Sequence, residues 1–131
     1  MKPIAVAMCM MLALSACRGD ETVSGYGAAD RVWVLESVDG APFAARAELE
    51  FPEQGKIAGQ APCNRFFADQ SAPYPWFKPG PIGATRMACA ELEAEQVFFD
   101  ALGAMTLSEV AGDTLILSND AGREMVFKAQ P

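Results

Sequence analysis

The sequence predicts a mainly β domain in which short antiparallel strands form a meander and one α-helix interrupts them. Two observations carry this prediction. Several short stretches alternate apolar and polar residues, and turn-forming pairs such as Asp39-Gly40 and Gly112-Asp113 separate them. One longer stretch instead repeats its apolar residues at helical spacing. The length, 131 residues, suits one domain of this kind.

The strands are expected near both ends of this domain. In residues 47–51 (AELEF), Ala47, Leu49 and Phe51 face one side while two glutamates face the other. Short turns join neighbouring strands, so the pairing should be antiparallel. The stretches with strand character are residues 32–38, 47–51, 56–60, 106–110, 114–118 and 123–128.

The helix is expected over about residues 91–103. Three glutamates, Glu91, Glu93 and Glu95, occupy its first turns, where the helix dipole favours negative charge. We interpret them as a solvated helix start; a catalytic pair of carboxylates is the less favoured alternative. The apolar face comprises Leu92, Val97, Phe98, Phe99, Leu102 and Met105.

A proline-rich segment, residues 71–83, carries Tyr74, Trp76 and Phe77 among four prolines. Proline donates no ladder hydrogen bond, which excludes a central strand through most of the segment. Aromatic residues in such a setting usually bury themselves, so we expect the three side chains to cap the core. A ligand-binding groove or a partner-binding patch is the alternative interpretation.

The amino-terminal residues have the features of an export signal. Lys2 precedes an apolar run of eleven residues, 4–14, which is shorter than the ~20 residues that a membrane-spanning helix needs. The following LSAC, residues 14–17, resembles a bacterial lipobox, which implies cleavage after residue 16 and acylation of Cys17. An ordinary secretion signal with an incidental Cys17 is the alternative. We therefore expect a signal peptide over 1–16, a lipidated flexible tether over 17–30 and a folded domain over 31–128.

The charge limits the classes of partner. The mature chain would carry 9 basic and 17 acidic side chains, a net charge of −8. Such a chain is unsuited to nucleic acid, and the lipid rather than charge would attach it to the membrane. The resemblance to lipoproteins also implies a sorting rule: Arg18 stands where inner-membrane lipoproteins carry aspartate, which favours the outer membrane, with the protein facing the periplasm. The absence of histidine removes the commonest general base and zinc ligand, so we expect no enzyme activity, metal or cofactor.

Two cysteines remain in the expected domain, Cys63 and Cys89. Their separation of 26 residues excludes a redox CxxC motif, and a metal site or an activated nucleophile lacks the histidines it would need. In an oxidising compartment, two such thiols are expected to form a disulfide.

Three blocks of sequence resemble the META-domain family, the HslJ-like heat-shock lipoproteins: GQAPCNRFF (59–67), GPIGATRMACAELEAEQVFFDAL (80–102) and GDTLILSNDAGREMVF (112–127). The resemblance covers about residues 31–128. It implies a small calycin-like antiparallel β-barrel with one helix, and an envelope protein linked to stress response. Pro62 stands where family members usually have glycine, so the loop before Cys63 is expected to differ locally.

The matching blocks contain a candidate polar motif, Asn64, Arg65 and Arg86. We expect Asn64 to bond its neighbouring backbone in a turn and the two arginines to pair with carboxylates, with a shared polar site as the alternative. The function expected is that of a non-catalytic envelope lipoprotein that binds an envelope protein. The alternative is an inhibitor of a lysozyme-type periplasmic hydrolase, or a binder of a small hydrophobic ligand at the barrel mouth.

Overall fold

A computed structural model describes residues 19–131 of the chain. The expected signal peptide and the expected lipidation site, Cys17, lie outside these residues. The elements in order are a 3-10 helix η1 (Val23–Tyr26) and strands β1 (Trp33–Val38), β2 (Ala41–Pro42), β3 (Glu48–Glu50), β4 (Lys56–Gln60), β5 (Arg65–Asp69) and β6 (Gly83–Ala84), then helix α1 (Leu92–Ala104) and strands β7 (Leu107–Ala111), β8 (Thr114–Ser118) and β9 (Glu124–Ala129).

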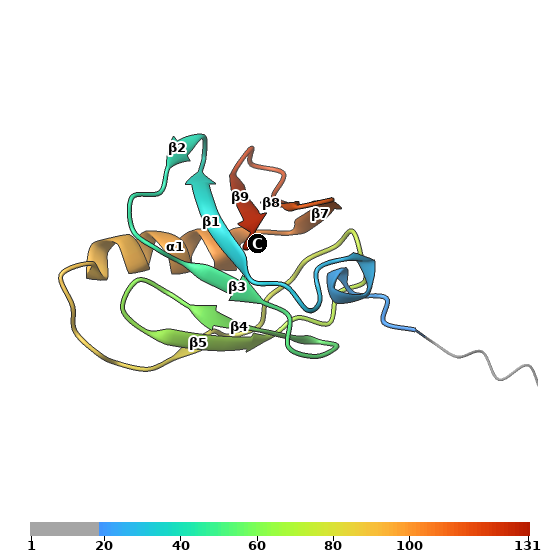
Figure 1. Ribbon diagram of the computed structural model, residues 1–131, viewed down its shortest axis with the longest axis horizontal. Helices are drawn as coiled ribbons and strands as arrows, with labels where there is room; N and C mark the ends of the chain where they lie inside the picture. Colours follow the sequence, from blue (N-terminus) through green and yellow to red (C-terminus); the bar gives the residue numbers. More distant parts are fainter. Residues whose placement is uncertain (1–18) are drawn as a thin grey trace, which may run out of the picture.

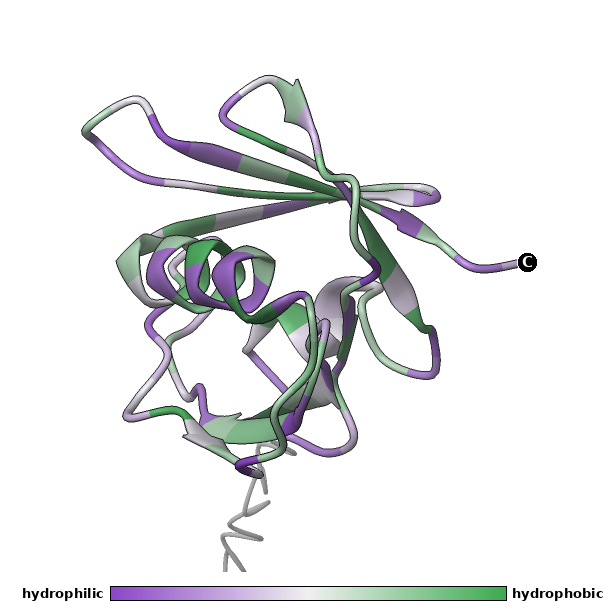
Figure 2. Cartoon of the chain, turned by 90° about the vertical axis from the view of Figure 1, so that its left-hand side faces the viewer, coloured by the Kyte–Doolittle hydropathy of each residue, from purple (hydrophilic) through white to green (hydrophobic). Residues whose placement is uncertain are grey.

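The strands form one antiparallel sheet in the order β6-β5-β4-β3-β1-β9-β8-β7, with β2 paired to β1. The sheet curls, and Figure 2 shows strands on two sides of helix α1. Its end strands, β6 and β7, do not pair with each other, so the barrel is not closed. The predicted fold class, a mainly β antiparallel meander or barrel with one helix, is therefore confirmed.

The predicted alternation places one face of each strand in the core. In β8 the burial alternates strictly, and Leu115 and Leu117 are fully buried. Helix α1 begins and ends within one residue of its expected bounds, and its Phe98 packs edge-on against Phe66 of β5, with ring centroids 5.4 Å apart. The largest fully buried side chains are Trp33, Leu49, Ile57, Phe66, Phe77, Phe98, Leu102, Met105, Leu115, Leu117, Met125 and Phe127.

Strand β5 was not predicted, although its pattern is that of a half-buried strand. Phe66 and Ala68 are buried, while Arg65, Phe67 and Asp69 are exposed. The strand pairs with β4 over all five of its residues.

Helix α1 and the curled sheet enclose a core between them. Within residues 19–131, no helix has the length and apolar character that crossing a bilayer would require.

The prediction of a flexible tether is wrong for residues 20–30, because this segment packs on the domain. Val23 and Ala28 are fully buried, and the Ala28 carbonyl accepts a hydrogen bond of 2.9 Å from the indole N–H of Trp33. Gly27, with φ of 109°, ends the 3-10 helix in a left-handed conformation that glycine adopts without strain. Because most residues of this segment are polar, its composition did not indicate that Val23 and Ala28 pack against the domain.

Two glycines, one in a strand and one in the helix, should respond oppositely to substitution by alanine. At Gly59 in β4, a Cβ atom would lie 2.0 Å from the Glu48 carbonyl oxygen and 2.8 Å from the Phe66 ring, so Gly59→Ala should lower the free energy of unfolding by about 1–3 kcal/mol. At Gly103 in α1 nothing lies within 4 Å, so Gly103→Ala should raise it by up to about 1 kcal/mol. Urea unfolding of the two variants measures both values, and a harmless Gly59→Ala would contradict the packing of β3 on β4.

Candidate functional site

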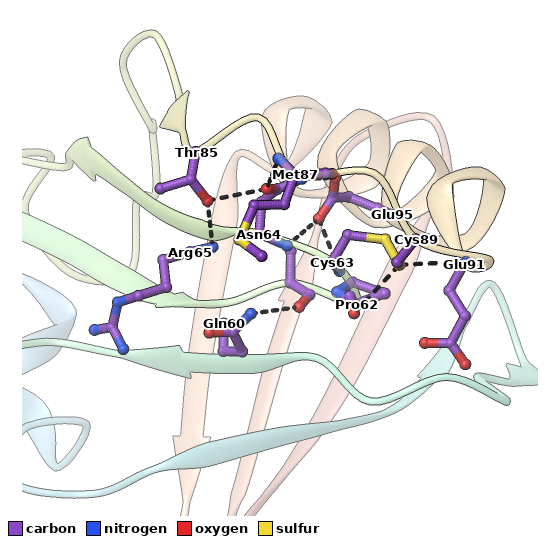
Figure 3. The surroundings of a disulfide bond; sticks show 11 residues. Gln60, Pro62, Cys63, Asn64, Arg65, Thr85, Met87, Cys89, Glu91 and Glu95 are labelled. Carbon is purple, nitrogen blue, oxygen red and sulfur yellow. Dashed lines mark hydrogen bonds between the residues drawn. A yellow bond between two sulfur atoms is a disulfide. The ribbon is translucent and has the colours of Figure 1, made fainter.

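A disulfide joins two loops that lie beside the start of helix α1. Cys63, in the loop between β4 and β5, is bonded to Cys89, in the loop between β6 and α1, with their Cα atoms 5.8 Å apart (Figure 3). The predicted pairing is therefore confirmed in the structure. Cys63 is half-buried and Cys89 is exposed, so the bond lies at the surface.

Asn64, next to Cys63, is buried and bonds residues that are distant in the sequence. Its carboxamide oxygen accepts hydrogen bonds from the Thr85 hydroxyl (2.9 Å) and the Met87 backbone N–H (2.6 Å). Its NH2 group donates to the Met87 carbonyl (3.1 Å) and to a carboxylate oxygen of Glu95 (2.8 Å). The expectation of a local turn contact is wrong for Asn64. Its side chain fastens the loop over residues 85–87 to β5 and α1 (Figure 3).

Glu95 supplies the acceptor at the centre of this arrangement. One of its carboxylate oxygens accepts backbone N–H groups from Cys63 (3.0 Å) and Asn64 (2.7 Å), and the other accepts the Asn64 side chain. The interpretation of the glutamates as solvated holds for Glu91 and Glu93 but is wrong for Glu95, which is buried. A signal was available in the sequence, because residue 95 lies three and seven positions before apolar residues 98 and 102 and so shares the core-facing side of the helix.

The two motif arginines remain free at the surface. Arg65 and Arg86 are exposed, and neither forms an ion pair within the part of the chain that the structure describes, so the predicted pairing with carboxylates is wrong there. The Arg65 side chain points away from the disulfide, while its backbone N–H donates to the Thr85 hydroxyl at 3.2 Å (Figure 3). The structure therefore separates Asn64, which holds the fold together, from the two arginines.

A groove with a volume of about 610 Å³ lies between the fastened loop and helix α1. Met87 and Leu92 are large apolar side chains in its lining, and they are 66% and 46% exposed. Arg86, which forms no ion pair within residues 19–131, adds a positive charge to the lining. Residues 19–131 contain no group of three or more side chains suited to holding a metal ion. The groove therefore combines exposed apolar surface with a positive charge.

The three aromatic residues of the proline-rich segment have different environments. Phe77 is 1% exposed and caps the core as predicted, with its backbone N–H donating to the Thr106 carbonyl. Tyr74 is half-buried and stacks on Tyr26, with ring centroids 4.5 Å apart. Trp76 is 58% exposed, so the capping prediction is wrong for this residue.

A model of the META domain matches residues 27–131, which include the sheet, the helix and the disulfide. The chain belongs to the META domain family. No protein with a curated description matches the chain. The match begins at residue 27 and so includes Ala28, which agrees with a folded part that starts before residue 31.

Solved structures share the architecture of this META domain. An NMR structure of a protein from Burkholderia xenovorans matches with a TM-score of 0.66 and 21% identity, over 82% of this chain and 87% of that one. A crystal structure of a DUF4847 family protein from Bacteroides vulgatus gives 0.63 and 12%, over 81% and 96%. A further protein solved by NMR gives 0.58 and 26%, over 75% and 87%. At such low identities the first two similarities show the fold alone.

The Glu95 carboxylate should be a major source of stability for this META domain. In Glu95→Gln, the amide oxygen can still accept the two backbone N–H groups, but the new NH2 group then faces the NH2 group of Asn64, and two donors cannot bond each other. The free energy of unfolding should therefore fall by about 1–3 kcal/mol. Glu93→Gln, an exposed change on the same helix, should alter it by less than about 0.5 kcal/mol. Equal effects in urea unfolding would contradict the role assigned to Glu95.

The disulfide should contribute through the unfolded chain. Closing a loop of 26 residues restricts the unfolded ensemble, so Cys63→Ser combined with Cys89→Ser should lower the free energy of unfolding by about 3–4 kcal/mol. Wild-type protein treated with a reductant should lose a similar amount, while the double variant should not respond to the reductant. Alkylation of both thiols in unreduced protein from the native host would contradict the disulfide.

Proposed function

We propose that this META domain protein is a non-catalytic lipoprotein of the outer membrane that faces the periplasm, takes part in the stress response and acts by binding an envelope protein. The observation that carries the proposal is the groove beside α1, where two exposed apolar side chains meet an arginine that forms no ion pair within residues 19–131. No cofactor or metal forms part of the proposal.

The groove has the properties of a preformed binding surface. Its outer wall, the loop over residues 85–89, is held by the disulfide at Cys89 and by the hydrogen bonds of Asn64 to Thr85 and Met87. Because the loop is already fastened, a partner would lose little free energy in ordering it.

The chemistry of the lining indicates what the partner should offer. Methionine adapts its unbranched side chain to varied apolar surfaces, and both methionine and arginine are enriched at protein interfaces. The guanidinium of Arg86 has no carboxylate partner within residues 19–131, and a carboxylate can engage it through two parallel hydrogen bonds. We therefore propose a partner segment with an apolar side chain next to an acidic residue.

The distribution of apolar side chains supports a surface site over a ligand within the barrel. The space between the curled sheet and α1 holds large buried side chains, among them Trp33, Phe66, Phe98 and Phe127. A hydrophobic ligand there would have to displace them, at a cost similar to unpacking the core. A partner on the outer surface requires no such rearrangement.

Lipid anchorage rests on the sequence. Cys17 follows an apolar run and two small residues, and Arg18 stands at the position used to sort such lipoproteins. The surface disulfide supports an oxidising compartment, because such bonds persist outside the cytosol. Each of these features is consistent with a protein held on the periplasmic side of a membrane.

Site-specific photocrosslinking in the native host tests the proposed groove. A photoreactive residue at Met87 should capture a reproducible envelope protein, because this side chain is exposed within the groove. The matched control is the same photoreactive residue at Val97. This side chain is 49% exposed on helix α1 but is not part of the groove lining. Arg86→Glu should reduce capture from position 87 by about tenfold, because it reverses the charge that the partner meets.

The outcomes separate the groove from the rest of the surface. Capture from position 87 but not from 97, with loss on charge reversal, supports the proposal. Equal capture from both positions, or no envelope protein captured from either under stress and normal growth, contradicts it. Far-ultraviolet circular dichroism of each variant verifies that the domain remains folded.

A further inference from the structure

We propose that a second surface of the domain rests on the bilayer itself, at the boundary between the lipid headgroups and the acyl chains. This surface, here called the aromatic end, consists of Tyr26, Tyr74 and Trp76 with Pro73 and Pro75. The inference rests on the proposed acylation of Cys17 and adds a defined orientation of the domain on the membrane.

The first step is the length of chain between the anchor and the folded part. Residues from Asp20 onward are held: the Thr22 backbone and hydroxyl both donate to the Asp20 carboxylate, and Val23 is fully buried. From Cys17 to Asp20 is three residues, which span at most about 11 Å even when fully extended. An acylated Cys17 would therefore keep Asp20 close to the bilayer surface.

The second step is what lies beside that attachment point. The backbone N–H of Tyr74 donates to the Glu21 carbonyl at 2.7 Å, one residue beyond Asp20. The ring of Tyr26 stacks on the ring of Tyr74, with centroids 4.5 Å apart and planes 10° apart. Trp76 follows two residues later and forms a β-bridge with Leu107. The aromatic end is thus fixed to the first ordered residues after the anchor.

The third step is the chemistry of the exposed side chains. Tyr26 is 53% exposed and Trp76 is 58% exposed. Tyrosine and tryptophan are enriched where membranes meet water, because their rings are largely apolar and carry one polar group. Beside Trp76 lies a groove of about 620 Å³ whose lining includes Pro73, Pro79 and Met105. These features match the headgroup–acyl boundary.

Charge decides which kind of lipid this surface should prefer. Glu21 is exposed at the attachment point and Lys78 is the cation that lines the neighbouring groove, so residues 19–131 place no basic cluster there. The mature chain is strongly acidic, and its attraction to the bilayer must come from ring insertion rather than from charge. Zwitterionic lipid should therefore be bound at least as well as anionic lipid. A protein partner at this surface would have to fit between it and a bilayer only about 11 Å from Asp20.

The orientation has a consequence for the groove beside α1. In Figure 1, η1 lies at one end of the long axis and helix α1 begins at the other end. Leu92 is the first residue of α1 and lines that groove. With the aromatic end on the lipid, the groove would be held at the far side of the domain, where it is open to the periplasm.

The two tryptophans make the inference testable by fluorescence. Trp33 is fully buried and Trp76 is exposed. The mature lipoprotein, residues 17–131, purified from bacterial membranes with its anchor, is reconstituted into phosphatidylcholine vesicles whose acyl chains carry bromine close to the headgroup. Bromine quenches tryptophan at short range, so the emission of Trp76 should fall and that of Trp33 should remain. Trp76→Phe should abolish the quenching.

A matched control places a tryptophan elsewhere on the same anchored protein. Trp76→Phe combined with Val97→Trp moves the exposed ring to helix α1, and we expect no quenching there. Quenching equal to that of the wild type would overturn the proposed orientation. The absence of quenching in the wild type, in a preparation whose Cys17 is shown by mass spectrometry to be acylated, would also overturn the orientation. That outcome would leave the proposed lipid anchorage intact. A Cys17 without acyl chains in the same preparation would overturn the anchorage and, with it, the orientation.

Discussion

The structure around the disulfide depends on the carboxylate of Glu95 and the backbone N–H groups of Cys63 and Asn64 that bond to it. A buried carboxylate is costly unless donors surround it, and here two backbone groups and one side-chain amide serve as donors. The loop before β5 is thereby held against helix α1. That position lets Cys63 reach Cys89 and lets Asn64 reach Thr85 and Met87, so the disulfide and the fastened loop follow from one interaction.

The strands and the helix were predictable because local patterns encode them. Alternation places Leu115 and Leu117 on one face of β8, and no distant contact is needed to see it. Strand β5 has an equally clear alternation, which the interpretation of the preceding Asn64 as a turn residue concealed. The packing of residues 20–30 was hidden for a different reason, since two buried residues, Val23 and Ala28, dock a segment whose average composition is polar.

The site was predictable only where the chain offered few choices. Two cysteines in a domain expected to be exported have one possible partner each, so the disulfide followed from their number. Asn64 instead bonds residues 21 to 31 positions away, and a residue type with many common roles gives no local sign of that. Glu95 lay between these cases. Its helical register with Phe98 and Leu102 placed it on the buried face, although nothing in the sequence indicated which donors it would meet.

A lipid anchor by itself fixes the position of a domain but leaves its rotation free. The two residues between Cys17 and Asp20 would restrict that rotation little unless a second point of the domain touches the bilayer, and the exposed rings of Tyr26 and Trp76 lie next to the attachment point. The contact of each ring with the bilayer would be weak. The proposed anchor would make that contact effectively intramolecular, so the rings would need little affinity for lipid. On the proposed membrane, the groove lined by Met87 and Leu92 would keep a constant orientation toward the periplasm, which would reduce the orientations that the proposed partner must sample.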